Sequence, residues 1–170
     1  MKVIIINSAP GVGKSTLLRA IEACNLNNIA VIDGDDLGRI VPLNGSNEWL
    51  DLIQDNIVGC AKNYLIYGVN FLFISFVFPS PDRITRLITL LNRASINDIS
   101  HLTLICNDFE IEKRILNRNT SKLISVGRAK ELNAMIKEMK SDFIIDTSEI
   151  SVQEVFQQMH ALLMQIEPGF

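Results

Sequence analysis

A short apolar run, followed by a glycine-containing loop and an amphipathic segment, constrains the fold of this chain more than any other feature. Val3–Ile6 is a continuous run of β-branched residues, which is typical of a strand buried on both faces of a sheet. The loop SAPGVGKST occupies residues 8–16, and apolar residues then recur at helical spacing. A strand, a tight loop and a helix in this order are the first unit of a parallel sheet covered by helices.

The same alternation continues to the end of the chain. With 170 residues, of which 48% are hydrophobic and 21% charged, the sequence fits one globular domain that spans residues 1–170. We predict an α/β fold in which helices cover both faces of one parallel sheet. The expected strands after the first are 29–32, 71–78, 101–106 and 143–145, and the expected helices are 14–24, 48–67, 82–94, 110–117, 129–140 and 152–166.

The loop matches a phosphate-binding pattern, GxxxxGK[ST], at all but its first position. Gly13, Lys14 and Ser15 fit the pattern, and Ser8 stands where the first glycine usually does. Glycine permits positive φ angles, so that successive amide N–H groups can point at phosphate oxygens. The lysine can reach the β- and γ-phosphates, and the serine hydroxyl can bind Mg²⁺. We therefore predict a triphosphate site formed by Ala9, Pro10, Gly11, Val12, Gly13, Lys14, Ser15 and Thr16.

Three carboxylates follow the second predicted strand, in the segment Asp33-Gly-Asp-Asp36. Ligands of parallel sheets bind beyond the carboxyl ends of the strands, so these side chains are expected beside the phosphate loop. We predict that Asp33 supports the metal, directly or through water. Asp35 is predicted to accept the proton of an acceptor hydroxyl, and Asp36 to cap the following helix.

Composition argues against several other classes of protein. The formal net charge of -3 is not that of a general binder of polyanions. Cys24, Cys60 and Cys106 lie far apart without a CxxC pair, which disfavours a zinc or redox site. The longest apolar run, FLFISFVF at 71–78, is much shorter than a membrane helix. We expect a cytoplasmic protein with no membrane partner.

The loop and the acidic segment together resemble the small P-loop kinases, in particular the gluconate kinase and shikimate kinase group. The segments ISFVFPSPDRITR, LICNDFEIEKRILNR and FIIDTS extend the resemblance over nearly the whole chain. It implies a five-stranded parallel sheet in the order 2-3-1-4-5, a closing lid, and ATP with Mg²⁺ as cofactors. It also implies that Lys14 and Ser15 meet the phosphates and the metal, and that Asp35 meets the acceptor hydroxyl.

Two departures from that group leave the acceptor open. The chain lacks the glycine triplet that follows the third strand of shikimate kinases, and it lacks the histidine- and phenylalanine-rich lid of gluconate kinases. We predict that Arg39 and Arg83, which follow the second and third strands, contact the acceptor. Nucleic acid is the less favoured acceptor class, because it requires a basic channel near these two arginines.

A run of basic residues marks the predicted lid. Six basic residues and no acids lie between Lys113 and Lys130, and we place a short lid at about 114–128. Arg114 and Arg118 are four residues apart and share one helix face, and guanidinium groups bind phosphate in a bidentate manner. By the resemblance, both flank the transferred phosphoryl group as catalytic residues, together with Lys14 and Asp35. Arg118 is also expected to contribute to ATP binding.

These observations predict an ATP-dependent phosphotransferase that moves the γ-phosphate to a hydroxyl of a small molecule. Two alternatives stay open: a polynucleotide or nucleoside 5′-kinase, and a nucleotide-binding sensor without substantial turnover. A GTPase is disfavoured. Asp35-Asp-Leu-Gly38 matches the short pattern DxxG, but no Asn-Lys-x-Asp segment occurs in the chain.

Overall fold

A computed structural model describes residues 1–24, 27–42, 45–117 and 124–166. Its five strands form one sheet in the order β2-β3-β1-β4-β5, and every neighbouring pair is parallel. Both the predicted fold class and the strand order that the resemblance implied are therefore confirmed. The strands are β1 (Lys2–Asn7), β2 (Ile29–Asp33), β3 (Phe71–Phe76), β4 (Ile99–Ile105) and β5 (Phe143–Asp146).

The described residues also contain seven helices, of which one was not predicted. They are α1 (Lys14–Ala23), α2 (Gly34–Leu37), α3 (Asn47–Tyr67), α4 (Pro81–Arg93), α5 (Asp108–Leu116), α6 (Val126–Lys137) and α7 (Val152–Ile166). The four-residue α2 forms directly after β2, because the Asp33 carboxylate caps it by accepting a hydrogen bond from the Asp35 N–H at 3.1 Å. The predicted cap residue, Asp36, was wrong: it lies inside the first turn of α2.

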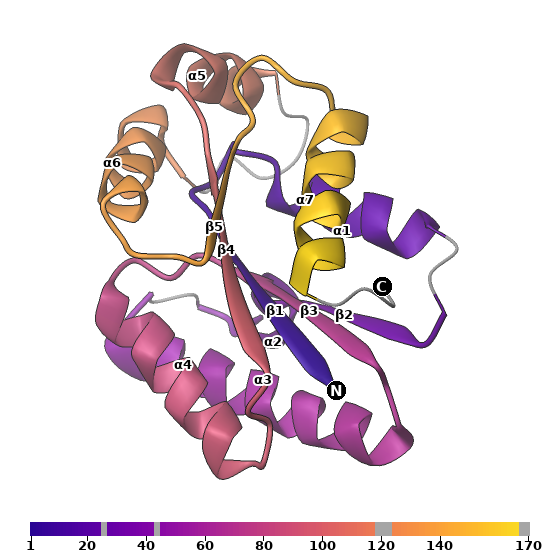
Figure 1. Ribbon diagram of the computed structural model, residues 1–170. Coiled ribbons are helices and arrows are strands. Elements are labelled where there is room, and N and C mark those ends of the chain that lie inside the picture. The colour runs from indigo at the N-terminus through magenta and orange to yellow at the C-terminus, as the bar shows by residue number, and fades with distance from the viewer. Residues whose placement is uncertain (25–26, 43–44, 118–123, 167–170) are drawn as a thin grey trace.

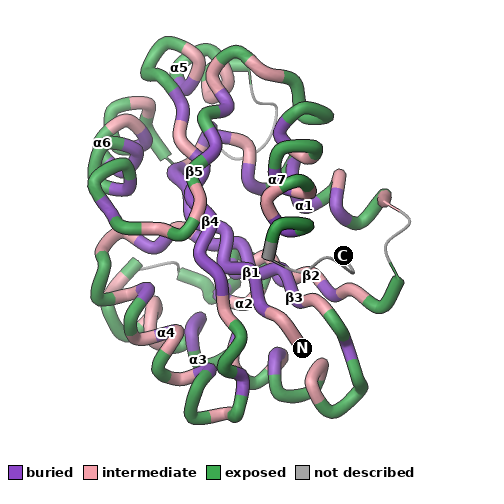
Figure 2. Tube along the Cα trace, viewed as in Figure 1, coloured by how far each residue is buried: buried purple, intermediate pink, exposed green. Residues whose placement is uncertain are grey.

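Helices cover both faces of the sheet (Figure 1), and alternating side chains of the strands pack into a hydrophobic layer on each face. Ile4 and Ile6 of β1 pack in the layer that contains α1, α5, α6 and α7. Val3 and Ile5 pack in the opposite layer, against α3 and α4. All four side chains are at most 1% exposed, as predicted for a central strand, and the whole centre of the sheet is buried (Figure 2). The sheet therefore holds the carboxyl ends of its strands rigidly at one edge.

Asn7, the last residue of β1, fixes the chain that follows β3. Its side chain is fully buried, accepts a hydrogen bond from the Phe78 N–H at 2.9 Å, and donates one to the Phe78 carbonyl at 3.2 Å. The third strand ends at Phe76 rather than at the predicted Phe78, because these two bonds replace the ladder there. Within the described ranges, no helix combines the length and the apolar character that a membrane span needs.

Candidate active site

The loop between β1 and α1 has the backbone that its glycines were predicted to supply. Gly11 and Gly13 have φ angles of 88° and 121°, which residues that carry a side chain rarely adopt. A Cβ atom on Gly11 would lie 3.0 Å from Cγ1 of Ile115, so α5 packs directly against the loop. The first glycine of the loop therefore has two reasons to be glycine, one conformational and one steric.

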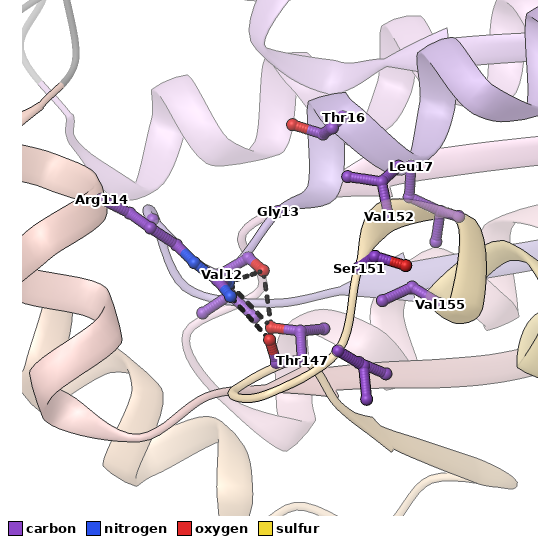
Figure 3. A pocket seen from close by; sticks show the side chains of 11 residues that line it. Val12, Gly13, Thr16, Leu17, Arg114, Thr147, Ser151, Val152 and Val155 are labelled. Atoms are coloured by element: carbon purple, nitrogen blue, oxygen red, sulfur yellow. Dashed lines mark hydrogen bonds between the residues drawn. The ribbon is translucent and has the colours of Figure 1, made fainter.

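Protein groups hold the carbonyls of this loop and so set the direction of its amides. The Val12 carbonyl accepts hydrogen bonds from Thr147 Oγ1 at 2.9 Å and from Arg114 Nη1 at 3.1 Å (Figure 3). The Ser8 carbonyl accepts one from Lys14 Nζ at 3.0 Å. In a trans peptide the N–H points opposite to the C=O, so the Gly13 amide points away from Arg114 and Thr147, and the Ala9 amide points away from Lys14. The direction of the Gly13 amide suits a donor to a phosphate oxygen.

The start of α1 is connected to the acidic segment through Asp33. Ser15 Oγ donates a hydrogen bond to Asp33 Oδ2 at 3.2 Å, while Asp33 Oδ1 caps α2. One carboxylate therefore positions both the hydroxyl predicted to bind metal and the helix that carries Asp35. The Lys14 side chain is 7% exposed and lies folded against its own loop. The structure thus brings together Lys14, Ser15, Asp33 and Asp35.

Asp35 lies in an environment that favours its protonated form. Burial raises the pKa of its carboxyl group, and the carboxylates of Asp33 and Asp36 raise it further. The charges of Lys14 and Arg39 act in the opposite direction and lower this pKa. The residue keeps an exposed surface, so water screens part of these effects. A carboxylate with a raised pKa is a better proton acceptor at neutral pH than an ordinary one.

Close packing fixes the acidic segment over α3 and β3. A Cβ atom on Gly34 would lie 2.7 Å from the Phe76 ring, and one on Gly38 would lie 2.4 Å from Ile53 Cδ1. The Gly38 carbonyl accepts a hydrogen bond from Trp49 Nε1 at 2.8 Å. Trp49 also contacts the Phe76 ring, with 6.1 Å between ring centroids, so it anchors α2 on the core.

Arg114 binds the loop itself. Besides the Val12 carbonyl, it donates to Thr147 Oγ1 at 3.1 Å and to the Thr147 carbonyl at 2.6 Å, and its Nε lies 3.5 Å from Glu110 Oε2. Its guanidinium group therefore joins α5, the phosphate loop and the end of β5 (Figure 3). Arg118, the second predicted lid arginine, lies outside the described residues, as do 118–123 of the predicted lid.

The other predicted cationic residues are already paired with carboxylates. Arg39 forms an ion pair with Asp36, and Arg83 pairs with Asp51 and donates to Asn47 Oδ1 at 2.8 Å. The basic run of the predicted lid is balanced by acids outside it. Its ion pairs are Lys113–Glu110, Arg128–Glu131 and Lys130–Glu112, at 2.9, 3.0 and 2.7 Å.

A pocket of about 300 Å³ opens beside the phosphate loop, on the side of α7 (Figure 3). This volume is at the lower end of ordinary small-molecule sites. One side of it is lined by residues of the loop, α1 and α5, namely Gly11, Val12, Gly13, Thr16 and Arg114. The other wall comes from Leu17 and from the segment after β5, where Ile150, Val152 and Val155 supply apolar side chains next to Thr147 and Ser151.

The far wall of this pocket was missed in the sequence. The resemblance included the segment FIIDTS at 143–148, but it did not extend to Ile150, Val152 and Val155. Their spacing is that of any helix start, so periodicity could not separate a pocket wall from a core face. These residues could be assigned to the pocket only from the strand order, because that order brings the chain after β5 back to the loop after β1.

Comparison with known proteins supports the fold. No protein-family model matches the sequence, and no curated protein matches it. Among solved structures, the tunicamycin resistance protein of Deinococcus radiodurans is 20% identical, with 95% of each chain covered and a TM-score of 0.71. A gluconokinase from Sinorhizobium meliloti 1021 is 15% identical, covering 99% of this chain and 94% of its own, with a TM-score of 0.69.

A third match was solved with ligands bound. The APS kinase of Mycobacterium tuberculosis, in complex with AMPPNP and APS, is 18% identical, with 95% of this chain and 96% of its own covered and a TM-score of 0.72. The fold of this chain is therefore that of the P-loop kinases, which confirms the predicted resemblance. At these identities the likeness concerns the fold alone.

Proposed function

We propose that the chain is an ATP-dependent kinase that transfers the γ-phosphate of ATP to a hydroxyl group of a small molecule. One observation carries this proposal: Asp33 joins the phosphate-loop hydroxyl of Ser15 to the helix that carries Asp35, a carboxylate with a raised pKa. A loop that only bound nucleotide would have no need of a proton acceptor at that place. The solved APS kinase complex shows that this fold can hold a nucleotide analogue and an acceptor together.

In this proposal the triphosphate lies along the phosphate loop and the adenosine occupies the 300 Å³ pocket. The Gly13 amide, turned away from the Arg114 and Thr147 side chains that hold the Val12 carbonyl, donates to a phosphate oxygen. Lys14 exchanges its hydrogen bond to the Ser8 carbonyl for the β- and γ-phosphates. The apolar side chains of Leu17, Ile150 and Val155 then contact the base.

The transfer step needs only one proton acceptor from the protein. The acceptor oxygen forms a bond to the γ-phosphorus while the bond between that phosphorus and the β,γ-bridging oxygen breaks, and ADP leaves. The hydroxyl proton moves to the Asp35 carboxylate. Lys14 faces the developing charge on the phosphoryl oxygens, and electrostatic stabilisation of this kind is usually the largest contribution to such catalysis.

The residues present fit a magnesium ion bound together with nucleotide. Mg²⁺ is usually held by one or two protein oxygens plus substrate phosphates and water. Ser15 Oγ and Asp33 Oδ2, 3.2 Å apart, are oxygen donors of this kind. Within the described part of the chain, no group of three or more His, Cys, Asp or Glu side chains would hold a metal without the nucleotide. When bound, Mg²⁺ would neutralise charge on the β- and γ-phosphates.

The extent of the domain and the position of the lid are also proposals. We treat residues 1–170 as one kinase domain, and we place a short lid at about 114–128 from which Arg118 would reach the transferred phosphoryl group. Arg114 has a different place in this proposal, because its bonds to Val12 and Thr147 make it a support of the loop. Arg114 acts through the loop, and Arg118 keeps the predicted contact with phosphate.

The pairing of Arg39 and Arg83 with carboxylates argues against the 5′-kinase alternative for nucleic acids, which requires free cations along a channel. The sensor alternative differs from the kinase only in turnover. Both a kinase and a sensor bind Mg·ATP, whereas only a kinase releases ADP faster when an acceptor is present.

The test combines calorimetry with an acceptor screen. The protein is titrated with Mg·AMPPNP, and ADP release is then followed with panels of sugars, hydroxy acids, nucleosides, antibiotics and oligonucleotides. For the acceptor found, we expect Asp35→Asn to lower the rate about 10²- to 10⁴-fold with nucleotide affinity unchanged. Lys14→Ala should weaken nucleotide binding itself.

The matched control is Asp98→Asn. Asp98 pairs with Lys2 at the amino ends of the strands, opposite the site, and its side chain is 57% exposed. The rate should therefore stay at the wild-type value. Failure to bind Mg·AMPPNP would contradict the whole proposal. Binding without acceptor-dependent ADP release for any compound would favour the sensor.

A further inference from the structure

We propose that the acceptor is a hydroxyl compound without anionic groups, either uncharged or cationic. This inference rests on the proposed function, because it concerns the surface that faces Asp35. We define that surface, the acceptor side, as residues 33–42, 45–56 and 78–86, which lie at and after the carboxyl ends of β2 and β3. The charges of these residues, and the contacts among them, carry the argument.

The acceptor side is one continuous surface beside the phosphate loop. Asp33 connects it to Ser15, as described above. The Leu37 and Gly38 carbonyls at the end of α2 accept hydrogen bonds from Asn56 and Trp49 of α3, at 2.9 and 2.8 Å. The first turns of α3 and α4 are joined through an ion pair between Asp51 and Arg83. A molecule that offers its hydroxyl to Asp35 therefore approaches across α2, α3 and α4.

Each of the three cations on this surface is bound to a carboxylate. Arg39 pairs with Asp36 in the same short helix. Arg83, whose side chain is only 16% exposed, pairs with Asp51. Arg86 lies 3.2 Å from Asp51 and 2.9 Å from Asp55. An anionic acceptor that bound one of these guanidinium groups would share it with a carboxylate that already neutralises its charge, so the anion would gain less than it does from an unpaired arginine.

The carboxylates outnumber these cations. The acceptor side contains three arginines and no lysine or histidine, against seven acids: Asp33, Asp35, Asp36, Glu48, Asp51, Asp55 and Asp82. Its formal charge of -4 exceeds in magnitude the -3 of the whole chain, so the negative charge of the molecule is concentrated there. A surface of one sign attracts ligands of the opposite sign and repels those of its own.

The acceptor side also carries exposed apolar side chains. Ile40 and Val41, which follow the Asp36–Arg39 pair, are 46% and 96% exposed. They add exposed apolar surface to the acceptor side, next to a guanidinium group that is already neutralised. Taken with the paired arginines, this arrangement suits a neutral polyol, a nucleoside or an amino alcohol, and disfavours carboxylates, sulfates and phosphate esters.

The first test measures the local potential without any need to know the acceptor. Amide signals of ¹⁵N-labelled protein are recorded at pH 7.5 with cationic aminomethyl-PROXYL and with anionic carboxy-PROXYL. We expect the cationic probe to relax exposed amides of the acceptor side about twofold or more faster than the anionic probe. Equal or faster relaxation by the anionic probe would overturn the proposal.

Matched variants show that the preference comes from the named carboxylates. On the acceptor side, the double variant Asp51→Asn with Asp55→Asn should lower the ratio of the relaxation caused by the cationic probe to that caused by the anionic probe. Asp98→Asn, at the amino ends of the strands, should leave it unchanged. No change in the double variant would contradict the assignment.

The second test compares acceptors that differ only in charge, with ADP release as the readout. Glucosamine, glucose and gluconate form one set, and uridine with uridine monophosphate forms another. Turnover restricted to the anionic members would overturn this inference while leaving the proposed kinase intact. Failure to bind Mg·AMPPNP would instead contradict the proposed kinase activity. The ratio of the relaxation rates with the two probes would still report the charge preference of the acceptor side.

Discussion

Asp35 shows at the scale of one residue how a catalytic role conflicts with stability. Burial raises its pKa above the ordinary value of 3.8, so the folded protein binds this proton more tightly than the unfolded chain does. The ionised carboxylate therefore costs folding free energy at neutral pH. This cost is absent below the ordinary pKa, where Asp35 is protonated in both states, and it is fully present above the raised pKa.

We accordingly predict that Asp35→Asn stabilises the protein at neutral pH. The gain in the free energy of unfolding should be largest near pH 7.5 and should shrink as the pH falls towards 3.8. Urea unfolding of both proteins between pH 4 and 8 measures it. Asp35→Glu, which keeps the charge, is the control and should show no such gain. A gain that grew on acidification would show that the sign of the pKa shift is wrong.

At the same scale, the sequence identified the chemistry of single residues better than their partners. Lys14, Ser15, Asp33 and Asp35 could be proposed as one site because the loop pattern and the strand ends both point to the same edge of the sheet. The pairing of Arg83 with Asp51 could not be foreseen, because it depends on how α3 packs against α4. The same holds for Arg114, whose three bonds to the loop and to Thr147 involve residues distant in the chain.

Among the elements, α2 differs most from what the sequence predicted. Four residues that begin with glycine have little intrinsic helix propensity, so periodicity could not detect them. The helix forms because Asp33 caps it and because its glycines let it approach Phe76 and Ile53 closely. The longer elements were predictable, since their apolar residues recur over several turns or fill a strand, and only their ends moved by a few residues.

The close approach of α2 to β3 leads to a second prediction. A Cβ atom on Gly34 would lie 2.7 and 2.9 Å from two ring atoms of Phe76 and 3.0 Å from its Cβ, and Phe76 is itself buried. We expect Gly34→Ala to destabilise the fold by about 1–3 kcal/mol, as overpacked cores do. It should also displace Asp35 and lower the rate of transfer.

Gly59 of α3 provides the matched control for this prediction. An added Cβ atom there meets no atom within 4 Å, and alanine is the better helix former by about 1 kcal/mol. Chemical denaturation should therefore show Gly59→Ala to be neutral or stabilising. Equal effects of the two substitutions would mean that backbone preference, and not contact with Phe76, decides the cost at position 34.

At the scale of the whole molecule, the phosphate loop is held by residues from the second half of the chain. Thr147 Oγ1 donates to the Val12 carbonyl across a separation of 135 residues, and Arg114 reaches the same carbonyl from α5. The parallel strand order places β4 and β5 beside β1, which brings these residues to the loop. The phosphate-binding conformation is thus a property of the complete sheet, although the loop sequence occupies only a few residues near the start.

This dependence can be tested with Thr147→Val, which keeps the shape of the side chain and removes its hydroxyl. The Val12 carbonyl then keeps the Arg114 bond, while Arg114 Nη1 and the Ile105 carbonyl lose their contacts with Thr147 Oγ1. The Val12–Gly13 peptide is then freer to rotate, and its amide is less well aligned with phosphate. Loss of one such hydrogen bond costs about 1 kcal/mol, and we expect Mg·AMPPNP to bind about fivefold more weakly. Calorimetry measures the affinity, and thermal unfolding without nucleotide reports the fold by itself.

Ser148→Ala is the comparison for this last experiment. Ser148 Oγ accepts a hydrogen bond from the Asn107 N–H at 2.8 Å and makes its contacts away from the Val12 carbonyl. Its removal should alter thermal stability to a similar extent and leave nucleotide affinity at the wild-type value. If both substitutions weakened binding equally, a general loosening of the segment after β5 would explain the effect, and the hydrogen bond from Thr147 would have no specific role in orienting the loop.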